Sequence, residues 1–230
     1  MLFQSPVYSK ASGSIAGLTY SHNRGGMYTR SRSMPTDPGT SLQQTVRSAM
    51  TSLAPYWGSD LSQAQRNGWD SYAAAVAMTN RLGETVYLTG QQHFLRCNVS
   101  RIQASMVVLD DAPTVYDLGT YTAPILSAAD TTPQIDIDFN NADAWAIAVG
   151  GQMLVYVGHD QGAGRKFYKG PWRYAGKISG AVSPPSSPAT IASPYSLAED
   201  NVVWVQIRVI QVDGRLSSAV IIGPTTIEAP

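Results

Sequence analysis

The chain has 230 residues, of which 43% are hydrophobic and 14% are charged, and sixteen basic side chains balance sixteen acidic ones. This length can bury the core of one large domain or two small ones, and the hydrophobic content is too high for a disordered chain. The low charge excludes a polyelectrolyte-like nucleic-acid binder. A single cysteine, Cys97, excludes an intramolecular disulfide framework and a cysteine-based zinc site. The sequence predicts neither a membrane span nor a secretory signal peptide.

The two halves of the chain differ in charge. Residues 1–112 carry nine basic and six acidic side chains, whereas residues 113–230 carry seven and ten. The basic excess is greatest in the first fifty residues and consists mainly of arginine, which favours bidentate contacts with carboxylate or phosphate. Such a bias is expected from a surface that is covered by neighbouring subunits, and also from ordinary drift in composition.

The first element predicted is a β-hairpin over residues 13–33. Both arms are rich in Thr, Tyr and Ser, and the residues from Asn23 to Gly26 tolerate the positive φ of a tight turn. No third strand is visible beside the hairpin. Alternation places a tyrosine and two arginines of the second arm on one face, where we expect contact with another subunit. The predicted interface residues are Tyr28, Arg30 and Arg32 of this arm, together with Arg47.

Three helices are expected next, and each opens with a capping-box spacing, in which Ser or Thr is followed three residues later by Gln. The three pairs are Thr40 with Gln43, Ser62 with Gln65, and Thr89 with Gln92. Apolar residues then recur at helical spacing, and the first helix is expected to end near Pro55. In that helix the apolar stripe is Leu42, Val46, Ala49, Met50 and Leu53.

Residues 110–124 have the composition of a domain junction, and beyond them the apolar period changes from 3.6 to 2. Gln134 to Phe139 alternates cleanly, and residues 172–178 could form another strand. Two hairpins are predicted, one around Gly150-Gly151 with arms 145–149 and 153–157, and one around Asp213-Gly214-Arg215. About seven short strands predict an antiparallel sandwich. The predicted fold class is therefore α+β, with a β-hairpin plus three-helix anchoring module in residues 1–112 and an antiparallel sandwich in residues 113–230.

The C-terminal half resembles fibronectin type III and related immunoglobulin-like domains. The long alternating strand around Trp204, followed by Asp213-Gly214 and then Leu216-Ser217-Ser218, is similar to the last hairpin of that family, and Trp145 is similar to its core tryptophan. This resemblance implies an Ig-like or fibronectin III-like sandwich for residues 113–230. Because the loops 158–170 and 179–194 are longer or richer in Pro and Gly than is usual in the family, the exact strand order stays open.

The whole arrangement is similar to a group of small proteins of tailed phages and prophages. The similarity lies in the Ser12–Ser21 arm, the Arg30-Ser31-Arg32 run, the Gln43-Gln44 pair before Arg47, and the Ig-like tail. It implies a virion component, but it carries over no catalytic residues and gives no position within the particle. We therefore expect a non-enzymatic structural component that is assembled in the host cytoplasm, and we favour a capsid-associated role, as a decoration or minor capsid protein, over a tail role. The implied partners are other virion subunits, such as the major capsid or a tail protein, and further copies of the chain.

A second hypothesis comes from residues 159–175, where bases and aromatics are interleaved. This composition suits a carbohydrate, a nucleic acid or a protein partner, although the acidic balance of this half disfavours nucleic acid. The chain would then be a tail or surface-exposed module that recognises a glycan or host surface. Alternatively, the aromatics pack on their own sandwich. The candidate ligand residues are Arg165, Lys166, Tyr168, Trp172 and Arg173.

No catalytic, metal or cofactor site is predicted. Asp136, Asp138 and Asn140 have the spacing that opens a calcium loop, but the sixth and twelfth positions of that loop do not fit. The run from Gly162 to Lys166 completes no phosphate-binding motif, and the three histidines are scattered without a nucleophile motif. The sequence therefore predicts a protein that is not an enzyme and binds no cofactor.

Overall fold

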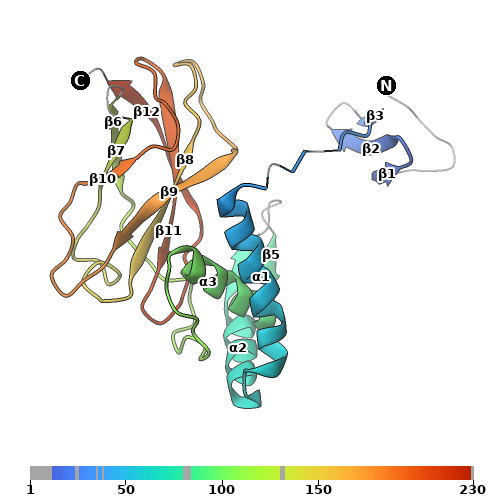
Figure 1. The fold of residues 1–230 in the computed structure, drawn as a ribbon, viewed down its shortest axis with the longest axis vertical. Coiled ribbons are helices and arrows are strands. Elements are labelled where there is room, and N and C mark those ends of the chain that lie inside the picture. Colours follow the sequence, from blue (N-terminus) through green and yellow to red (C-terminus); the bar gives the residue numbers. More distant parts are fainter. Residues whose placement is uncertain are drawn as a thin grey trace. The chain divides into compact units, whose positions relative to one another are not determined.

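The protein is described by a computed structural model that covers residues 12–23, 26–34, 36–37, 39–79, 84–129 and 133–228. The chain divides into two compact units, Met1–Thr40 and Ser41–Pro230. Among the described residues, the first unit holds a small sheet, and the second holds three helices, a short strand pair and a seven-stranded sheet (Figure 1). The predicted α+β class with three helices is thus confirmed, whereas the predicted boundary after residue 112 stays a prediction.

The first unit is an antiparallel sheet of β1 (Gly13–Ile15), β2 (Leu18–Asn23) and β3 (Gly26–Ser31). Strands β2 and β3 form the predicted hairpin, in a register that runs from Leu18 opposite Ser31 to Asn23 opposite Gly26. Gly26 has a φ of 114°, as the turn requires, and residues 24–25 of the predicted turn lie outside the described residues. The expectation that no third strand pairs with the hairpin was wrong, because β1 pairs with β2. The strand β1 has only three residues, which are too few to show an alternating pattern in the sequence.

The three helices are α1 (Ser41–Ser59), α2 (Gln63–Ala75) and α3 (Gly90–Gln103), and the strands β4 (Ala77–Thr79) and β5 (Thr85–Tyr87) pair between α2 and α3. Both capping boxes predicted for α2 and α3 are present. The predicted end of the first helix was wrong, because α1 continues through Pro55 to Ser59. Proline removes one helical hydrogen bond, but Tyr56 and Trp57 beyond it pack on Phe94 with ring centroids 6.2 and 5.6 Å away. This packing outweighs the local preference.

The large sheet contains the strands β6 to β12 in the order β10-β7-β6-β12-β11-β8-β9. Neighbouring strands are antiparallel, except that the end of β12 runs parallel to β6. The strand β12 pairs with β11 over its first part and with β6 through Ile227 and Glu228. The edges approach each other, since a Cβ on Gly176 would lie 3.6 Å from Ile191. The bounds are β6 (Ile125–Ala129), β7 (Gln134–Asp138), β8 (Gln152–Gly158), β9 (Trp172–Ser179), β10 (Ala189–Ala192), β11 (Val202–Ile210) and β12 (Val220–Glu228).

The strands of this sheet enclose a core that follows the predicted alternation. Ile135, Ile137 and Phe139 point inward as expected, and Trp145 is fully buried beside them. The hairpin predicted around Asp213-Gly214-Arg215 exists, with β11 and β12 as its arms. The hairpin predicted around Gly150-Gly151 was wrong, because residues 145–149 form turns across the end of the sheet and only β8 is a strand.

A second core joins the helices to the sheet. Trp69, Tyr72 and Phe94 of the helices are buried together with Leu154, Ile210 and Leu216 of the sheet and its β11–β12 connection. Residues 104–124, which contain no helix or strand, connect the two layers and are held by hydrogen bonds. Their carbonyl groups at Asp110 and Asp117 accept hydrogen bonds from Trp69 Nε1 and the Tyr72 hydroxyl, at 2.8 and 2.7 Å. The predicted junction is therefore a packed connection.

Candidate protein interface

The N-terminal sheet has two chemically different faces. Residues that lie directly opposite each other on antiparallel strands point to the same face. Tyr28 lies opposite Ser21 and Arg30 lies opposite Thr19, so these four share a polar, basic face. The other face carries apolar side chains from all three strands. These are Ile15, Leu18, Tyr20 and Met27, and the same face also carries the polar His22, Thr29 and Ser31. We call it the apolar face.

This sheet has no core of its own. No described residue from 12 to 34 is buried, and on the apolar face Ile15 is 72% and Leu18 is 46% exposed. The lack of burial continues into α1, where Ala49 is the first buried residue among those described. Of the apolar stripe predicted for α1, Ala49 and Leu53 are buried, but the rest is exposed. The exposed members are Leu42, Val46 and Met50, at 40%, 36% and 43%.

The four predicted interface residues lie in two different units. Tyr28 is half-buried and Arg30 exposed on the same face of β3, and Arg32 follows the strand, where its backbone N–H donates to the Gly17 carbonyl at 2.8 Å. The guanidinium groups of Arg30 and Arg32 form no ion pair with a described residue. Arg47 lies in the second unit, on the exposed first half of α1.

In the predicted ligand loop, two of the five candidate side chains pack on the sheet. Tyr168 is 7% exposed and stacks on Trp204, with ring centroids 5.8 Å apart, and the edge of Trp172 completes the cluster at 5.0 Å. The Tyr168 hydroxyl accepts a hydrogen bond from the backbone N–H of His159 at 3.0 Å and donates one to the Pro171 carbonyl at 2.8 Å. These contacts fix the shape of the loop.

The other three candidates, Arg165, Lys166 and Arg173, are exposed on the same loop and on β9. The Arg165 guanidinium lies 5.4 Å from the ring centre of Phe167, and Phe167 is itself 61% exposed. Arg173 lies over the ring of Tyr195 at 5.0 Å. Phe167 was not among the predicted ligand residues. Its position directly after Arg165 and Lys166 could have indicated it as a candidate.

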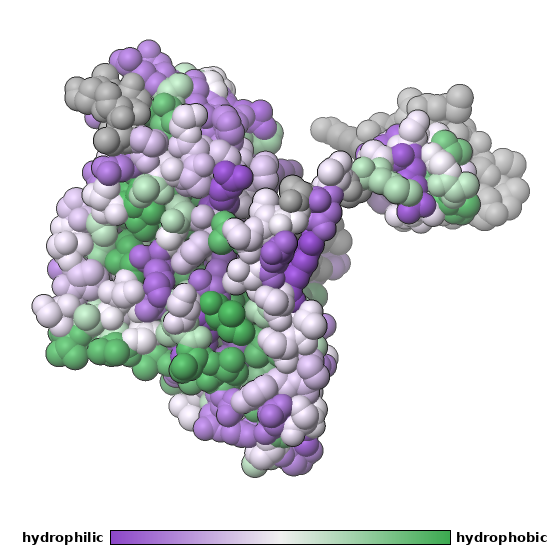
Figure 2. Space-filling model, in the orientation of Figure 1, coloured by the Kyte–Doolittle hydropathy of each residue, from purple (hydrophilic) through white to green (hydrophobic). Residues whose placement is uncertain are grey.

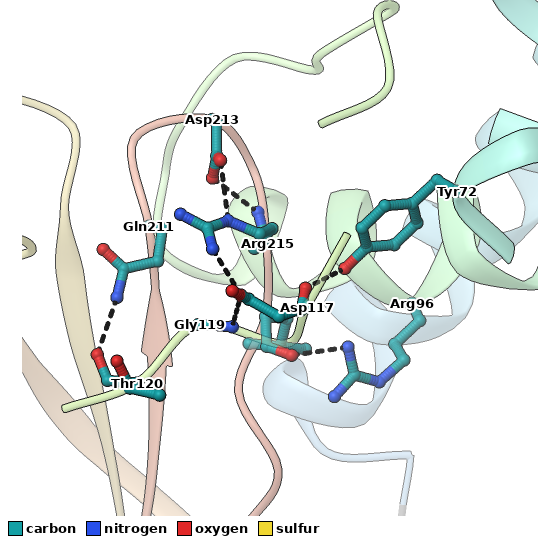
Figure 3. Close-up of polar contacts among 9 residues, drawn as sticks. Tyr72, Arg96, Asp117, Gly119, Thr120, Gln211, Asp213 and Arg215 are labelled. Carbon is teal, nitrogen blue, oxygen red and sulfur yellow. Dashed lines mark hydrogen bonds and ion pairs between the residues drawn. The ribbon is translucent and has the colours of Figure 1, made fainter. Parts of the chain in front are cut away.

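Sequence reasoning also missed a polar cluster that locks α2 and α3 onto the β11–β12 connection (Figure 3). The Asp117 carboxylate accepts from the Gly119 N–H at 2.6 Å and pairs with Arg215, which also pairs with Asp213 at 2.7 Å. These two donors hold the pKa of Asp117 below its usual value. From α3, Arg96 donates to the Leu216 and Ser217 carbonyls at 2.6 and 2.8 Å. Every charge in this cluster has a partner, so its role is structural.

His93 and Cys97 on α3 are both buried, and burial shifts their pKa values in opposite directions. His93 is fully buried, and neither ring nitrogen has a hydrogen-bond partner among the described residues. Burial, together with the positive charge of Arg96, lowers the pKa of His93 to about 4. Burial raises the pKa of the Cys97 thiol to about 11. Both groups are therefore neutral at pH 7, and the buried thiol is unreactive.

The comparisons with known proteins identify no relative from which a function could be inferred, so the structure described above is the main guide to function. No protein family matches the chain, and no curated protein matches its sequence. Within the part of the chain that the structure describes, no group of three or more His, Cys, Asp or Glu side chains is arranged to hold a metal ion. None of the described helices has the length and apolar character needed to cross a bilayer.

Proposed function

We propose that the chain is a non-enzymatic structural subunit of a phage-like particle, associated with the capsid, whose N-terminal region docks on a neighbouring subunit. The observation that carries the docking role is the absence of any buried side chain among the described residues from 12 to 48, although this stretch contains three strands and the start of a helix. The assignment to a phage-like particle rests on the sequence resemblance given above.

The N-terminal sheet is expected to be only marginally stable by itself, and this favours docking on a partner. Ordering each backbone residue costs about 1–2 kcal/mol, and small sheets are stable in water only where an apolar face is covered. In β1–β3 the apolar face is open at Ile15 and Leu18, and the outer edges of β1 and β3 have no strand beside them among the described residues. A partner that covers this face or adds a strand to an edge would supply the missing stabilisation.

The charge of the region indicates an acidic partner. Arg30 and Arg32 form no ion pair with a described carboxylate, and the described residues from 12 to 34 include no Asp or Glu. Two copies of β3 placed edge to edge would bring like charges together, which is unfavourable. A neighbouring subunit with an acidic surface therefore suits this sheet better than a second copy of it.

We also propose that the seven-stranded sheet is an immunoglobulin-like sandwich of the fibronectin III kind. With the strands lettered along the chain in that family's manner, β12, β11 and β8 are neighbours, as G, F and C are in this family. The strands β6, β7 and β10 are neighbours in the same way as A, B and E. Trp145 in the core supports the same assignment.

Incorporation into particles tests the docking role. We expect Ile15→Asp/Leu18→Asp to keep the thermal unfolding midpoint of the free protein, because both side chains are exposed, and to be missing from particles purified from cells that express it. The double variant Arg30→Glu/Arg32→Glu should behave in the same way. A matched control is Arg165→Glu, which reverses an exposed charge in the second unit and should be incorporated normally. Normal incorporation of both double variants would refute the docking role.

A second candidate function, glycan or host-surface recognition by residues 159–175, is favoured by one observation. Phe167 is 61% exposed beside Arg165, on a loop whose shape is fixed by Tyr168. A rigid, exposed aromatic ring is typical of a binding surface. If the loop binds glycans, the protein should bind on a glycan array and Phe167→Ala should abolish binding without lowering the unfolding midpoint. Equal binding by Phe167→Ala would remove this candidate.

A further inference from the structure

The connection between β8 and β9, residues 159–171, is basic, and we call it the basic loop. Residues 161–198, which include most of it, contain five basic side chains and no acidic one. One of the five, Lys177, donates a hydrogen bond to the Ala104 carbonyl. The other four are exposed and form no ion pair with a described residue. They are Arg165, Lys166, Lys169 and Arg173.

The basic loop lies at the end of the large sheet where β12 ends, which is the upper end in Figure 1. Gly158 at the end of β8 lies opposite Trp172 at the start of β9, and Val202 at the start of β11 lies opposite Thr226 of β12. Figure 2 shows that hydrophilic residues gather at this end of the sheet. The surface here is therefore polar, with few exposed apolar groups.

Hydrogen bonds hold the basic loop in one shape. Gln161 and Val202 exchange two backbone hydrogen bonds of 2.9 and 2.7 Å, and the contacts of Tyr168 given above fix the second half of the loop. Between these points the Arg165 Nε–H donates to the Phe167 carbonyl at 3.2 Å, which keeps the guanidinium 5.4 Å from the centre of the Phe167 ring. An exposed cation and an exposed ring are thus presented together, so little conformational entropy is lost when a ligand binds both.

A second cation and ring lie at the same end of the sheet. The ring centre of Tyr195 is 5.0 Å from the Arg173 guanidinium carbon and 5.1 Å from the ring centre of His159. The Asp160 carboxylate, whose side chain is 8% exposed, accepts from His159 Nδ1 at 2.8 Å and from the Asn201 amide at 2.6 Å. These bonds orient the His159 ring, which is itself 58% exposed. Two positive groups are therefore placed beside aromatic rings at this end.

The charges around the basic loop select an anionic ligand whose charges are far apart. Four exposed bases attract an anion. Glu199 and Asp200 are also exposed, on a turn that lies beside the loop, because Asn201 after them donates to Asp160. These two carboxylates would repel a ligand such as a nucleic acid, which carries a negative charge on every unit. A ligand with occasional acidic groups can pair with the bases and avoid both carboxylates.

The exposed ring indicates the same class of ligand. Phe167 is the only exposed Phe, Trp or Tyr in residues 159–175. Nucleic acids are normally held by several aromatic rings, on which successive bases stack. A sugar ring needs only one, because its C–H groups pack on the negative face of a single aromatic ring. An oligosaccharide that carries acidic groups therefore suits this surface better than a nucleic acid.

We propose that the basic loop binds an anionic oligosaccharide, in which one sugar ring packs on Phe167 and a carboxylate, sulfate or phosphate group of the sugar pairs with Arg165. Arginine offers two parallel N–H donors to such an oxyanion. Lys166 and Lys169 add a weaker attraction, because exposed charges are screened by salt. This inference rests on the second candidate function above and names the class of glycan that it recognises.

A glycan array built of matched pairs tests the charge of the ligand. Each pair is an acidic oligosaccharide and its neutral counterpart: oligogalacturonate and its methyl ester, sulfated dextran and dextran, and phosphorylated mannan and mannan. We expect the full-length protein to bind at least one acidic member about tenfold more tightly than its neutral counterpart. The difference should shrink as the NaCl concentration rises. The pair that binds also identifies the oxyanion.

Three variants separate the roles of the charge and the ring. Arg165→Gln should weaken binding of the acidic member about tenfold, which is the loss expected for a charged hydrogen bond. Phe167→Ala should abolish binding of both members of the pair. The matched control Arg30→Gln removes an exposed positive charge from the first unit, and it should bind like the wild type. All three side chains are exposed, so the thermal unfolding midpoint should stay the same.

The outcomes distinguish this inference from the function on which it rests. Equal binding of acidic and neutral members, lost in Phe167→Ala, would overturn the anionic ligand but keep glycan recognition. No loss in Arg165→Gln, or an equal loss in Arg30→Gln, would also overturn it. Tighter binding of a single-stranded oligonucleotide than of any acidic glycan would assign the surface to nucleic acid. If no member of the array binds, glycan recognition and the anionic ligand are both wrong.

Discussion

The substitution Leu216→Ala tests whether the helices and the sheet form one cooperative unit. Leu216 is fully buried in the core that it shares with Trp69, Tyr72 and Phe94. Truncation of a buried leucine to alanine costs about 2–5 kcal/mol, because it loses transfer free energy and leaves a cavity. In a chain of this size each kcal/mol lowers the unfolding midpoint by about 2–4 °C, so a loss of about 3 kcal/mol corresponds to about 6–12 °C.

Hydrogen exchange by mass spectrometry, measured along a urea titration, separates the two possible responses. Because Leu216 lies between the layers, we expect peptides from α3 and from β11 to lose protection together and by similar free energies. If the chain instead consists of independent modules divided at residue 112, β11 will lose protection while α3 keeps its wild-type protection. That result would refute the shared core.

Two further predictions concern the buried histidine and the turns. Because the pKa of His93 falls from about 6.5 when unfolded to about 4 when folded, protonation favours the unfolded state. Stability should be complete above pH 6.5 and decline by at most about 3 kcal/mol as the pH falls to 4, and His93→Gln should flatten that slope in urea titrations at each pH. Gly180→Ala should destabilise by several kcal/mol, because its Cβ would overlap the Trp145 carbonyl, whereas a Cβ on Gly162 meets nothing within 4 Å. Equal unfolding midpoints for Gly180→Ala and Gly162→Ala would contradict that packing.

The elements that follow from local chemistry could be predicted from the sequence. The capping boxes at Ser62 and Thr89 depend on side chains only three residues apart, so their spacing is sufficient to place the helix starts. The inward direction of Ile135 and Ile137 follows from strand alternation in the same way. In each case the structure is decided by residues that are close together in the sequence, so the sequence alone is sufficient to predict it.

The elements that depend on tertiary contacts could not be predicted in this way. Pro55 is a local stop signal, but Trp57 two residues later gains more from packing on Phe94 than the missing hydrogen bond costs. Residues 145–149 are as apolar as a strand, yet the close approach of Gly180 to the Trp145 carbonyl bends them across the end of the sheet. Their composition shows that they are apolar but not what covers them.

The candidate interface was predicted only in part. The composition singled out Arg30 and Arg32, whose paired face follows from alternation. The apolar face was missed, because Ile15 and Leu18 share a face only once β1 is paired with β2.

Hydrogen exchange of the isolated, full-length chain tests the central claim most directly, namely that the N-terminal sheet has no core of its own. Because no described residue from 12 to 34 is buried, the account predicts amide exchange close to the unprotected rate in peptides that cover β1–β3. Peptides from β8 and β11, where most side chains are buried, should exchange slowly in the same sample. Protection of β1–β3 equal to that of β11 in a monomeric sample would show that the sheet is stable without a partner and would contradict the account.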